Sequence, residues 1–118
     1  MSSAPRLERE VETDFVEFCK QLKIVCKKLK MASESSWPDR TLLYRGFVMF
    51  MELKKRGEKP TDLQMYTLNL LTTMGFEARW SNDLEQMKLI VIAWKQYVDD
   101  TIKSLDDLRK RARSAGGN

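Results

Sequence analysis

The side chains that could do chemistry in this chain of 118 residues are amines, carboxylates and two thiols, because the sequence contains no histidine. Histidine is the commonest general base and the most frequent transition-metal ligand. The sequence also lacks a glycine-rich phosphate loop, a Gly-x-Ser-x-Gly elbow and a His-Glu-x-x-His signature. Any reaction would depend on lysine, aspartate and glutamate alone. We therefore expect a protein that is not an enzyme and that needs no cofactor or small-molecule substrate.

Two acidic pairs, Asp99-Asp100 and Asp106-Asp107, are the nearest that the sequence comes to a metal site. They are seven residues apart on one predicted helix. Hard cations need more converging oxygen atoms than these pairs supply, usually including loop carbonyls. We interpret the pairs as a solvated acidic face and predict no metal site.

Cys19 and Cys26 are seven residues apart in a segment with helical periodicity. At about 1.5 Å per residue their Cα atoms would be about 10 Å apart, beyond the reach of a disulfide. No Cys-x-x-Cys pair is present to hold zinc. The thiols are expected to be small core residues of a reduced, intracellular protein, in the cytoplasm or the nucleus. We expect no signal peptide and no membrane insertion, because no apolar window reaches the required length.

Two groups of basic residues could bind nucleic acid or an acidic partner, although the net charge is only +4. The first is a row of lysines at helical spacing: Lys20, Lys23, Lys27 and Lys30. This row would span about 15 Å, enough to follow several phosphates of a duplex. The second lies near the C-terminus: Arg109, Lys110, Arg111 and Arg113. Basic residues late in a helix also complement its dipole, so solvated faces are the alternative interpretation.

Apolar residues recur at helical spacing in four segments, which predicts four helices. Their ranges are about 7–30, 38–56, 62–74 and 82–113. Thr61 and Gln64 predict a capping box at the start of the third segment, which Gly75 ends. Residues 89–94 alone could form a buried strand, but both flanks keep helical spacing. We interpret residues 76–80 as a short connection and residues 114–118 as a mobile tail.

The composition favours a single all-α domain, a four-helix bundle-like fold with long first and last helices. Apolar residues make up 42% of the chain, and glycine and proline together occupy eight positions, too few for a sandwich or barrel. The second helix is apolar on every side and should be the most enclosed. The residues predicted to lie deep in the core are Phe47, Phe50, Leu70, Val91 and Trp94.

The last predicted helix is too long for its neighbours to cover. It would extend about 45 Å, whereas the third would extend about 18 Å. An uncovered apolar stripe usually meets a partner chain. We therefore predict a homodimer, or a groove that captures a partner helix, on residues 97–108, with Trp37 as an exposed anchor. The stripe consists of Val98, Ile102, Leu105 and Leu108.

Together these features predict a non-enzymatic, self-associating helical module that binds other proteins, such as an adaptor or accessory protein. The alternative is a nucleic-acid-binding protein that contacts the backbone of duplex RNA or DNA through the lysine-rich helix face. The two hypotheses differ in their response to salt, because binding to phosphates weakens steeply as the salt concentration rises.

Overall fold

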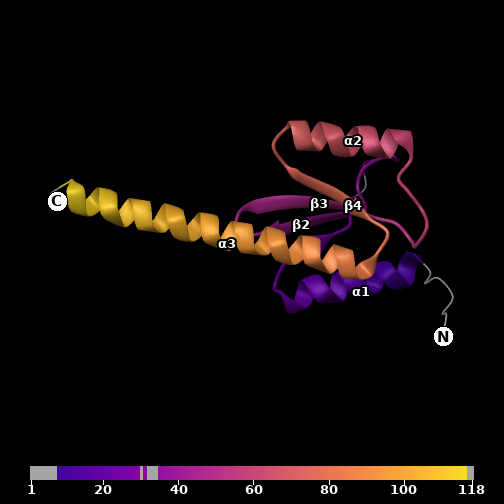
Figure 1. The fold of residues 1–118 in the computed structure, drawn as a ribbon, viewed down its shortest axis with the longest axis horizontal. Helices are drawn as coiled ribbons and strands as arrows, with labels where there is room; N and C mark the ends of the chain where they lie inside the picture. Colours follow the sequence, from indigo (N-terminus) through magenta and orange to yellow (C-terminus); the bar gives the residue numbers. More distant parts are fainter. Residues whose placement is uncertain (1–7, 30, 32–34, 117–118) are drawn as a thin grey trace.

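The computed structural model describes residues 8–29, 31 and 35–116 of the chain. Helices α1 and α3 lie along one face of a four-stranded sheet, and α2 lies on the other face (Figure 1). The elements in chain order are α1 (Glu8–Gln21), β1 (Val25–Lys27), β2 (Arg40–Tyr44), β3 (Phe47–Leu53), α2 (Asp62–Thr73), β4 (Glu77–Ser81) and α3 (Leu84–Ala115). The protein is thus an α/β protein of three layers, and the prediction of an all-α bundle is wrong.

The sheet has the strand order β1-β2-β3-β4. The pairs β1–β2 and β2–β3 are antiparallel, whereas β4 runs parallel to β3. Parallel neighbours cannot be joined by a tight turn, because the chain must return to the same end of the sheet. Helix α2 makes this crossover between β3 and β4 and thereby covers the second face.

The segment predicted as the second helix, 38–56, is instead the β2–β3 hairpin. Tyr44 pairs with Phe47, so Arg45 and Gly46 form a two-residue turn. Both turn residues have positive φ, 50° and 88°, as the type I′ turn requires. Because helices cover both faces of the sheet, apolar residues occupy both faces of β3 and the alternation typical of a strand is lost. The helix prediction failed for this reason.

The first predicted helix, 7–30, is also too long. Helix α1 ends at Gln21, and the chain reverses through Lys23, whose φ is 61°. Residues 25–27 then form the edge strand β1. The reversal brings Cys26 back to Cys19, and a hydrogen bond between the two thiols raises the pKa of Cys19 and lowers that of Cys26. Both cysteines are free thiols. The predicted separation of about 10 Å between their Cα atoms assumed one continuous helix, and it does not apply because the chain reverses between them.

The third predicted helix is confirmed as α2, with the expected capping box. Thr61 Oγ1 accepts a hydrogen bond from the Gln64 N–H at 3.1 Å, and Gln64 Oε1 accepts one from the Thr61 N–H at 2.9 Å. Gly75 follows the helix at a φ of 97°, a conformation that favours glycine. The predicted connection 76–80 is wrong, because residues 77–81 form β4.

The fourth predicted helix is confirmed as α3, including residues 89–94. Its N-cap is Asp83, whose carboxylate accepts hydrogen bonds from two N–H groups of the first turn. The helix continues to Ala115, so residues 114 and 115 are not a mobile tail, and residues 117–118 lie outside the described part of the chain. No helix among the described residues is long and apolar enough to cross a membrane.

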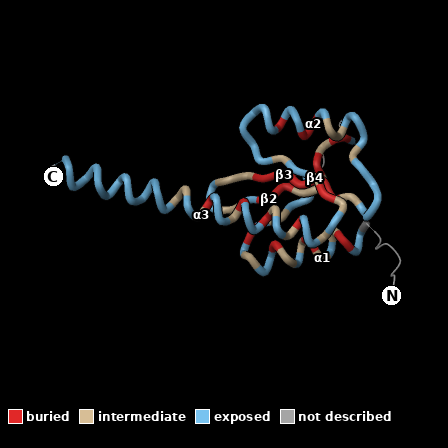
Figure 2. Tube along the Cα trace, in the orientation of Figure 1, coloured by how far each residue is buried: buried red, intermediate tan, exposed pale blue. Residues whose placement is uncertain are grey.

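The main core lies between the sheet and the helices α1 and α3, where buried segments face one another (Figure 2). Phe50, Val91 and Trp94 are buried as predicted. Phe47 is only half-buried, and Leu70 is 44% exposed, so both of these core predictions are wrong. Leu70 was misplaced because α2 buries a different side, through Thr67, Leu68 and Leu71.

The C-terminal part of α3 projects beyond the rest of the molecule (Figure 1). Residues 103–116 are all exposed, and Figure 2 shows this segment without a buried residue. The predicted interface stripe is therefore divided. Val98 is fully buried and Ile102 packs against the core, whereas Leu105 and Leu108 are exposed.

The two sides of β2 provide a test of the layer arrangement. We expect Leu42→Ala to lower the free energy of unfolding by about 2–5 kcal/mol, because Leu42 is fully buried under α1 and α3. Leu43→Ala is the matched control, because the neighbouring side chain points to the other face and is 42% exposed. Its cost should be below about 1 kcal/mol in urea unfolding. Equal losses for the two variants would contradict this register.

Candidate active site

Asp39 and Glu52 lie opposite each other at one end of the β2–β3 hairpin. Arg40 pairs with Met51, so continuing the register by one residue places Asp39 beside Glu52. The Asp39 N–H donates a hydrogen bond to Glu52 Oε1 at 3.2 Å. The Leu53 N–H donates one to Asp39 Oδ2 at 2.8 Å. The hairpin therefore fixes two carboxylates against each other.

Lys54 completes this group, which we call the carboxylate–lysine site: Asp39, Glu52 and Lys54. Lys54 follows Glu52 by two residues, so both side chains lie on the same face of the strand. Lys54 Nζ is 3.3 Å from Glu52 Oε2, and the Lys54 side chain is 14% exposed. Its backbone N–H donates to the carbonyl oxygen of Ser81 at 2.9 Å. The end of β4 thus holds the lysine backbone in place.

The electrostatics of the site favour a cation. Glu52 is 2% exposed, and this burial raises its pKa to about 7. Repulsion from Asp39 acts in the same direction, whereas Lys54 opposes it. When both carboxylates are ionised, one lysine cannot neutralise them. A buried carboxylate with a perturbed pKa beside a second carboxylate and a lysine is typical of functional sites.

The loop that precedes β2 is anchored to both the sheet and α2. Pro38 is buried, and Trp37 packs edge-on against Phe50 with the ring centroids 5.5 Å apart. The hydroxyls of Ser36 and Thr67 are 2.9 Å apart, which ties the loop to α2. Trp37 is therefore half-buried in this loop rather than an exposed anchor for a partner chain.

A second charged group lies on the opposite face of β2. Arg40 Nε donates to Glu12 Oε2 at 2.8 Å, and Lys28 Nζ is 3.9 Å from the same oxygen. Because Arg40 is the neighbour of Asp39, the two side chains point to opposite faces. This ion pair ties α1 to the start of β2, directly behind the carboxylate–lysine site.

The structure brings three of the four predicted lysines together, but not on a helix face. Lys20 is in α1, Lys23 is in the reversal that follows and Lys27 is in β1. All three line a pocket of about 380 Å³. Lys30 lies outside the described residues. Their shared surface arises from the reversal of the chain, which the helical prediction did not include.

The second predicted basic group lies on the projecting part of α3. Its members, Arg109, Lys110, Arg111 and Arg113, are all exposed. The carboxylate–lysine site is remote from them, because α3 begins just after Ser81 and runs away from it (Figure 1). The structure therefore separates this group from the candidate active site.

The acidic pairs of α3 are engaged within the chain. Asp99 accepts hydrogen bonds from Tyr44 Oη at 2.7 Å, Arg45 Nη1 at 2.8 Å and Lys95 Nζ at 3.1 Å. The Tyr44 hydroxyl and the two cations lower the pKa of Asp99 to about 2. Asp100 accepts from Gln96, and the other pair is engaged as Lys103–Asp107 and Arg109–Asp106. Asp99 therefore fixes the β2–β3 turn to α3, and the other three aspartates form hydrogen bonds or ion pairs along the surface of α3.

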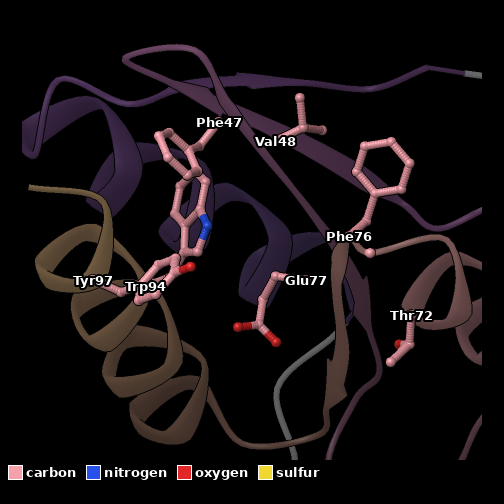
Figure 3. Close-up of a pocket in the computed structure, with 8 residues that line it drawn as sticks. Phe47, Val48, Thr72, Phe76, Glu77, Trp94 and Tyr97 are labelled. Carbon is pink, nitrogen blue, oxygen red and sulfur yellow. The ribbon is translucent and has the colours of Figure 1, made fainter. Parts of the chain in front are cut away.

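A pocket of about 270 Å³ lies at the opposite end of β3 (Figure 3). The aromatic side chains of Phe47, Trp94 and Tyr97 lie on one side, with the Glu77 carboxylate across from them (Figure 3). The other residues that line it are Val48, Thr72, Gly75 and Phe76. Its lining contains one carboxylate, Glu77, and no lysine or second carboxylate, so this pocket offers less chemistry than the carboxylate–lysine site.

Sequence reasoning missed the carboxylate–lysine site because all three residues fall in the wrongly predicted helix 38–56. In such a helix, Asp39 and Lys54 would only complement the helix dipole at its start and at its end. The overlooked signal was the alternation Glu52-Leu53-Lys54 at the end of an apolar run with Arg45-Gly46 near its middle. An Arg-Gly turn between two apolar strands would have placed Asp39 opposite Glu52.

Comparison with known proteins identifies the fold. No protein-family model matches the sequence, and no curated protein is significantly similar to it. A solved structure described as a "VRR_NUC domain" is 23% identical with a TM-score of 0.66, covering 71% of this chain and 92% of that chain. A "VRR_NUC domain protein" is 18% identical with a TM-score of 0.60, covering 84% and 92%.

These likenesses overturn three of the expectations drawn from the sequence. The all-α class is wrong, and so are the non-enzymatic interaction module and the expected absence of enzymatic activity. The apolar periodicity behind the all-α expectation came from strands covered on both faces, whereas the expectation of no enzymatic activity rested on the absence of histidine and of catalytic motifs. The chain has the α/β fold of these two VRR_NUC domains.

Proposed function

We propose that this protein is a nuclease that uses a divalent cation to hydrolyse a phosphodiester bond of nucleic acid. The observation that carries the proposal is the carboxylate–lysine site, held at the end of the hairpin in a fold shared with VRR_NUC domains. Asp39 and Glu52 would hold the cation. Lys54 would act on the phosphate.

The donor set fits Mg²⁺ or Mn²⁺ better than zinc. Among the described residues no group of three histidine, cysteine, aspartate or glutamate side chains gathers to form a closed metal site. Mg²⁺ does not need one, because it is usually held by one or two carboxylates and keeps water molecules and substrate phosphates as its other ligands. A bound cation would also relieve the repulsion between Asp39 and Glu52.

Each residue of the site has a role that follows from its chemistry. A bound divalent cation would polarise the phosphate and lower the pKa of a bound water molecule. Lys54 has three N–H donors and a positive charge, which stabilise the negative charge that develops on a phosphate oxygen. Glu52 holds Lys54 Nζ at 3.3 Å and so positions it. Asp39 is fixed through Oδ2 by the Leu53 N–H.

The surface chemistry fits an anionic substrate. The chain carries 21 basic and 17 acidic residues, and two exposed basic residues, Lys55 and Arg56, follow Lys54 directly. The pocket lined by Lys20, Lys23 and Lys27 remains a predicted contact for a nucleic-acid backbone. The predicted homodimer also remains a proposal, with Leu105 and Leu108 as its exposed apolar residues. An intracellular location would suit a nuclease.

Substitutions at the carboxylate–lysine site test the activity. We expect Asp39→Asn, Glu52→Gln and Lys54→Met each to lower the cleavage rate by at least about 10²-fold, because each removes a cation ligand or a phosphate donor. The rate is measured on labelled single-stranded and duplex DNA and RNA with Mg²⁺ or Mn²⁺, and EDTA should abolish it. Glu85→Gln is the control, since that side chain is 80% exposed. Full activity in Glu52→Gln would contradict the proposal.

The raised pKa of Glu52 predicts how stability changes with pH in the cation-free protein. The folded pKa of about 7 lies above the ordinary glutamate value of 4.5, so the folded state binds the proton more tightly than the unfolded state. This group therefore favours folding below about pH 4.5, and the contribution is lost as the pH rises through 7. Glu52→Gln removes the ionisation, so its stability relative to the parent protein should increase between pH 5 and pH 8, by about 2–3 kcal/mol.

Urea unfolding in EDTA at pH 5, 6, 7 and 8 measures this difference. Adding Mg²⁺ at pH 8 should stabilise the parent protein, because a ligand that binds only the folded state shifts the equilibrium. The same addition should leave Glu52→Gln nearly unchanged. A stability difference that does not vary with pH would show that Glu52 is not a titrating buried carboxylate.

A further inference from the structure

The projecting part of α3 carries a concentrated positive charge. Four basic residues occupy five consecutive positions, Arg109, Lys110, Arg111 and Arg113, and no acidic residue follows Asp107 in the sequence. We call residues 103–115 the basic arm. Among the described residues only Arg109 of these four is in an ion pair, with Asp106 at 3.5 Å. The arm is exposed on all sides along its length (Figure 2).

The helix dipole does not account for this cluster. Favourable interactions between basic side chains and the dipole are confined to about the last turn of a helix. Only Arg113 lies in the last turn of α3. The other three basic residues gain little from the dipole, and they repel one another in a free arm. A polyanion bound along the arm would remove this repulsion.

A second copy of the chain fits the surface of the basic arm less well than a polyanion does. The apolar stripe of the arm consists of Leu105, Leu108 and Ala112, spaced by three and four residues as in a coiled coil. Arg109 and Arg111 flank this stripe on its two sides. Two parallel arms would place these arginines at the same level, without acidic partners beside them. The charge therefore favours a polyanion over a second arm.

The length of α3 sets the distance between the arm and the carboxylate–lysine site. The helix begins at Leu84, three residues after Ser81, whose carbonyl oxygen is bonded to Lys54. Arg109 follows Leu84 by 25 residues, which corresponds to about 38 Å along the helix axis. A duplex rises about 3.4 Å per base pair, so this distance spans about 11 base pairs. A rigid duplex of that length could contact both places.

We propose that the basic arm binds the phosphate backbone of duplex nucleic acid about 11 base pairs from the bond that is cleaved. This inference rests on the proposed nuclease function and specifies its substrate: a duplex long enough to reach the arm. The arm acts as a second contact that raises the affinity for long duplexes. It does not take part in the chemistry of cleavage.

A variant with all four basic residues of the cluster replaced by glutamine tests the proposal. We expect its affinity for a duplex of about 30 base pairs to fall at least tenfold at low salt, with a shallower dependence of affinity on salt. Its kcat/KM for a duplex of about 8 base pairs, which cannot contact the arm while it occupies the carboxylate–lysine site, should stay within twofold. Lys88→Gln is the control, because this lysine lies on α3 outside the arm and pairs with Glu85.

Each outcome of these measurements would either support or overturn the proposal that the basic arm binds duplex nucleic acid. Unchanged affinity of the glutamine variant for the long duplex would overturn the proposal, and so would an equal loss on both duplexes. A dimer in sedimentation that Leu105→Lys and Leu108→Lys dissociate, with unchanged duplex binding, would assign the arm to a second copy instead. Binding is measured without cleavage, in EDTA. The arm can therefore be tested even if the chain cleaves no substrate and the proposed function fails.

Discussion

The two-residue turn between β2 and β3 is the constraint on which the rest of the molecule depends. Arg45 and Gly46 both adopt positive φ, and this fixes Tyr44 opposite Phe47. The same register, followed to the other end of the hairpin, brings Asp39 to Glu52. A slip by one residue would turn every side chain of one strand to the other face. One turn therefore determines both the core and the candidate active site.

The chemistry of the candidate active site comes from an unfavourable electrostatic arrangement that the fold maintains. Burial disfavours the ionised form of Glu52, yet the neighbouring Asp39 adds further negative charge. A buried carboxylate of this kind costs folding stability unless a partner offsets it. Lys54 offsets it only in part. The site is thus arranged to accept a positive charge from outside the chain, and the binding of that charge and the stability of the fold are coupled.

Local signals in the sequence were sufficient for the helices α2 and α3 and insufficient for the β2–β3 hairpin and for β4. The capping box of Thr61 and Gln64 and the position of Gly75 determine α2 by contacts within a few residues. The hairpin depends instead on helices distant in sequence, which cover both faces of β3 and remove its alternation. The candidate active site was missed because it exists only once two strands are paired. The lysines of the N-terminal region were found, but their shared surface depends on the reversal at Lys23.

The edges of the sheet have a consequence for the behaviour of the protein at high concentration. A sheet edge presents unpaired N–H and C=O groups, to which a strand of another chain can add. Here one edge strand, β1, has only three residues and is followed by a further lysine, Lys28. The other, β4, carries the charged side chains of Glu77 and Arg79. Short and charged edges resist the growth of a sheet from one molecule into the next. The apolar strand β3 is an inner strand of the sheet and is therefore protected from pairing with strands of other molecules.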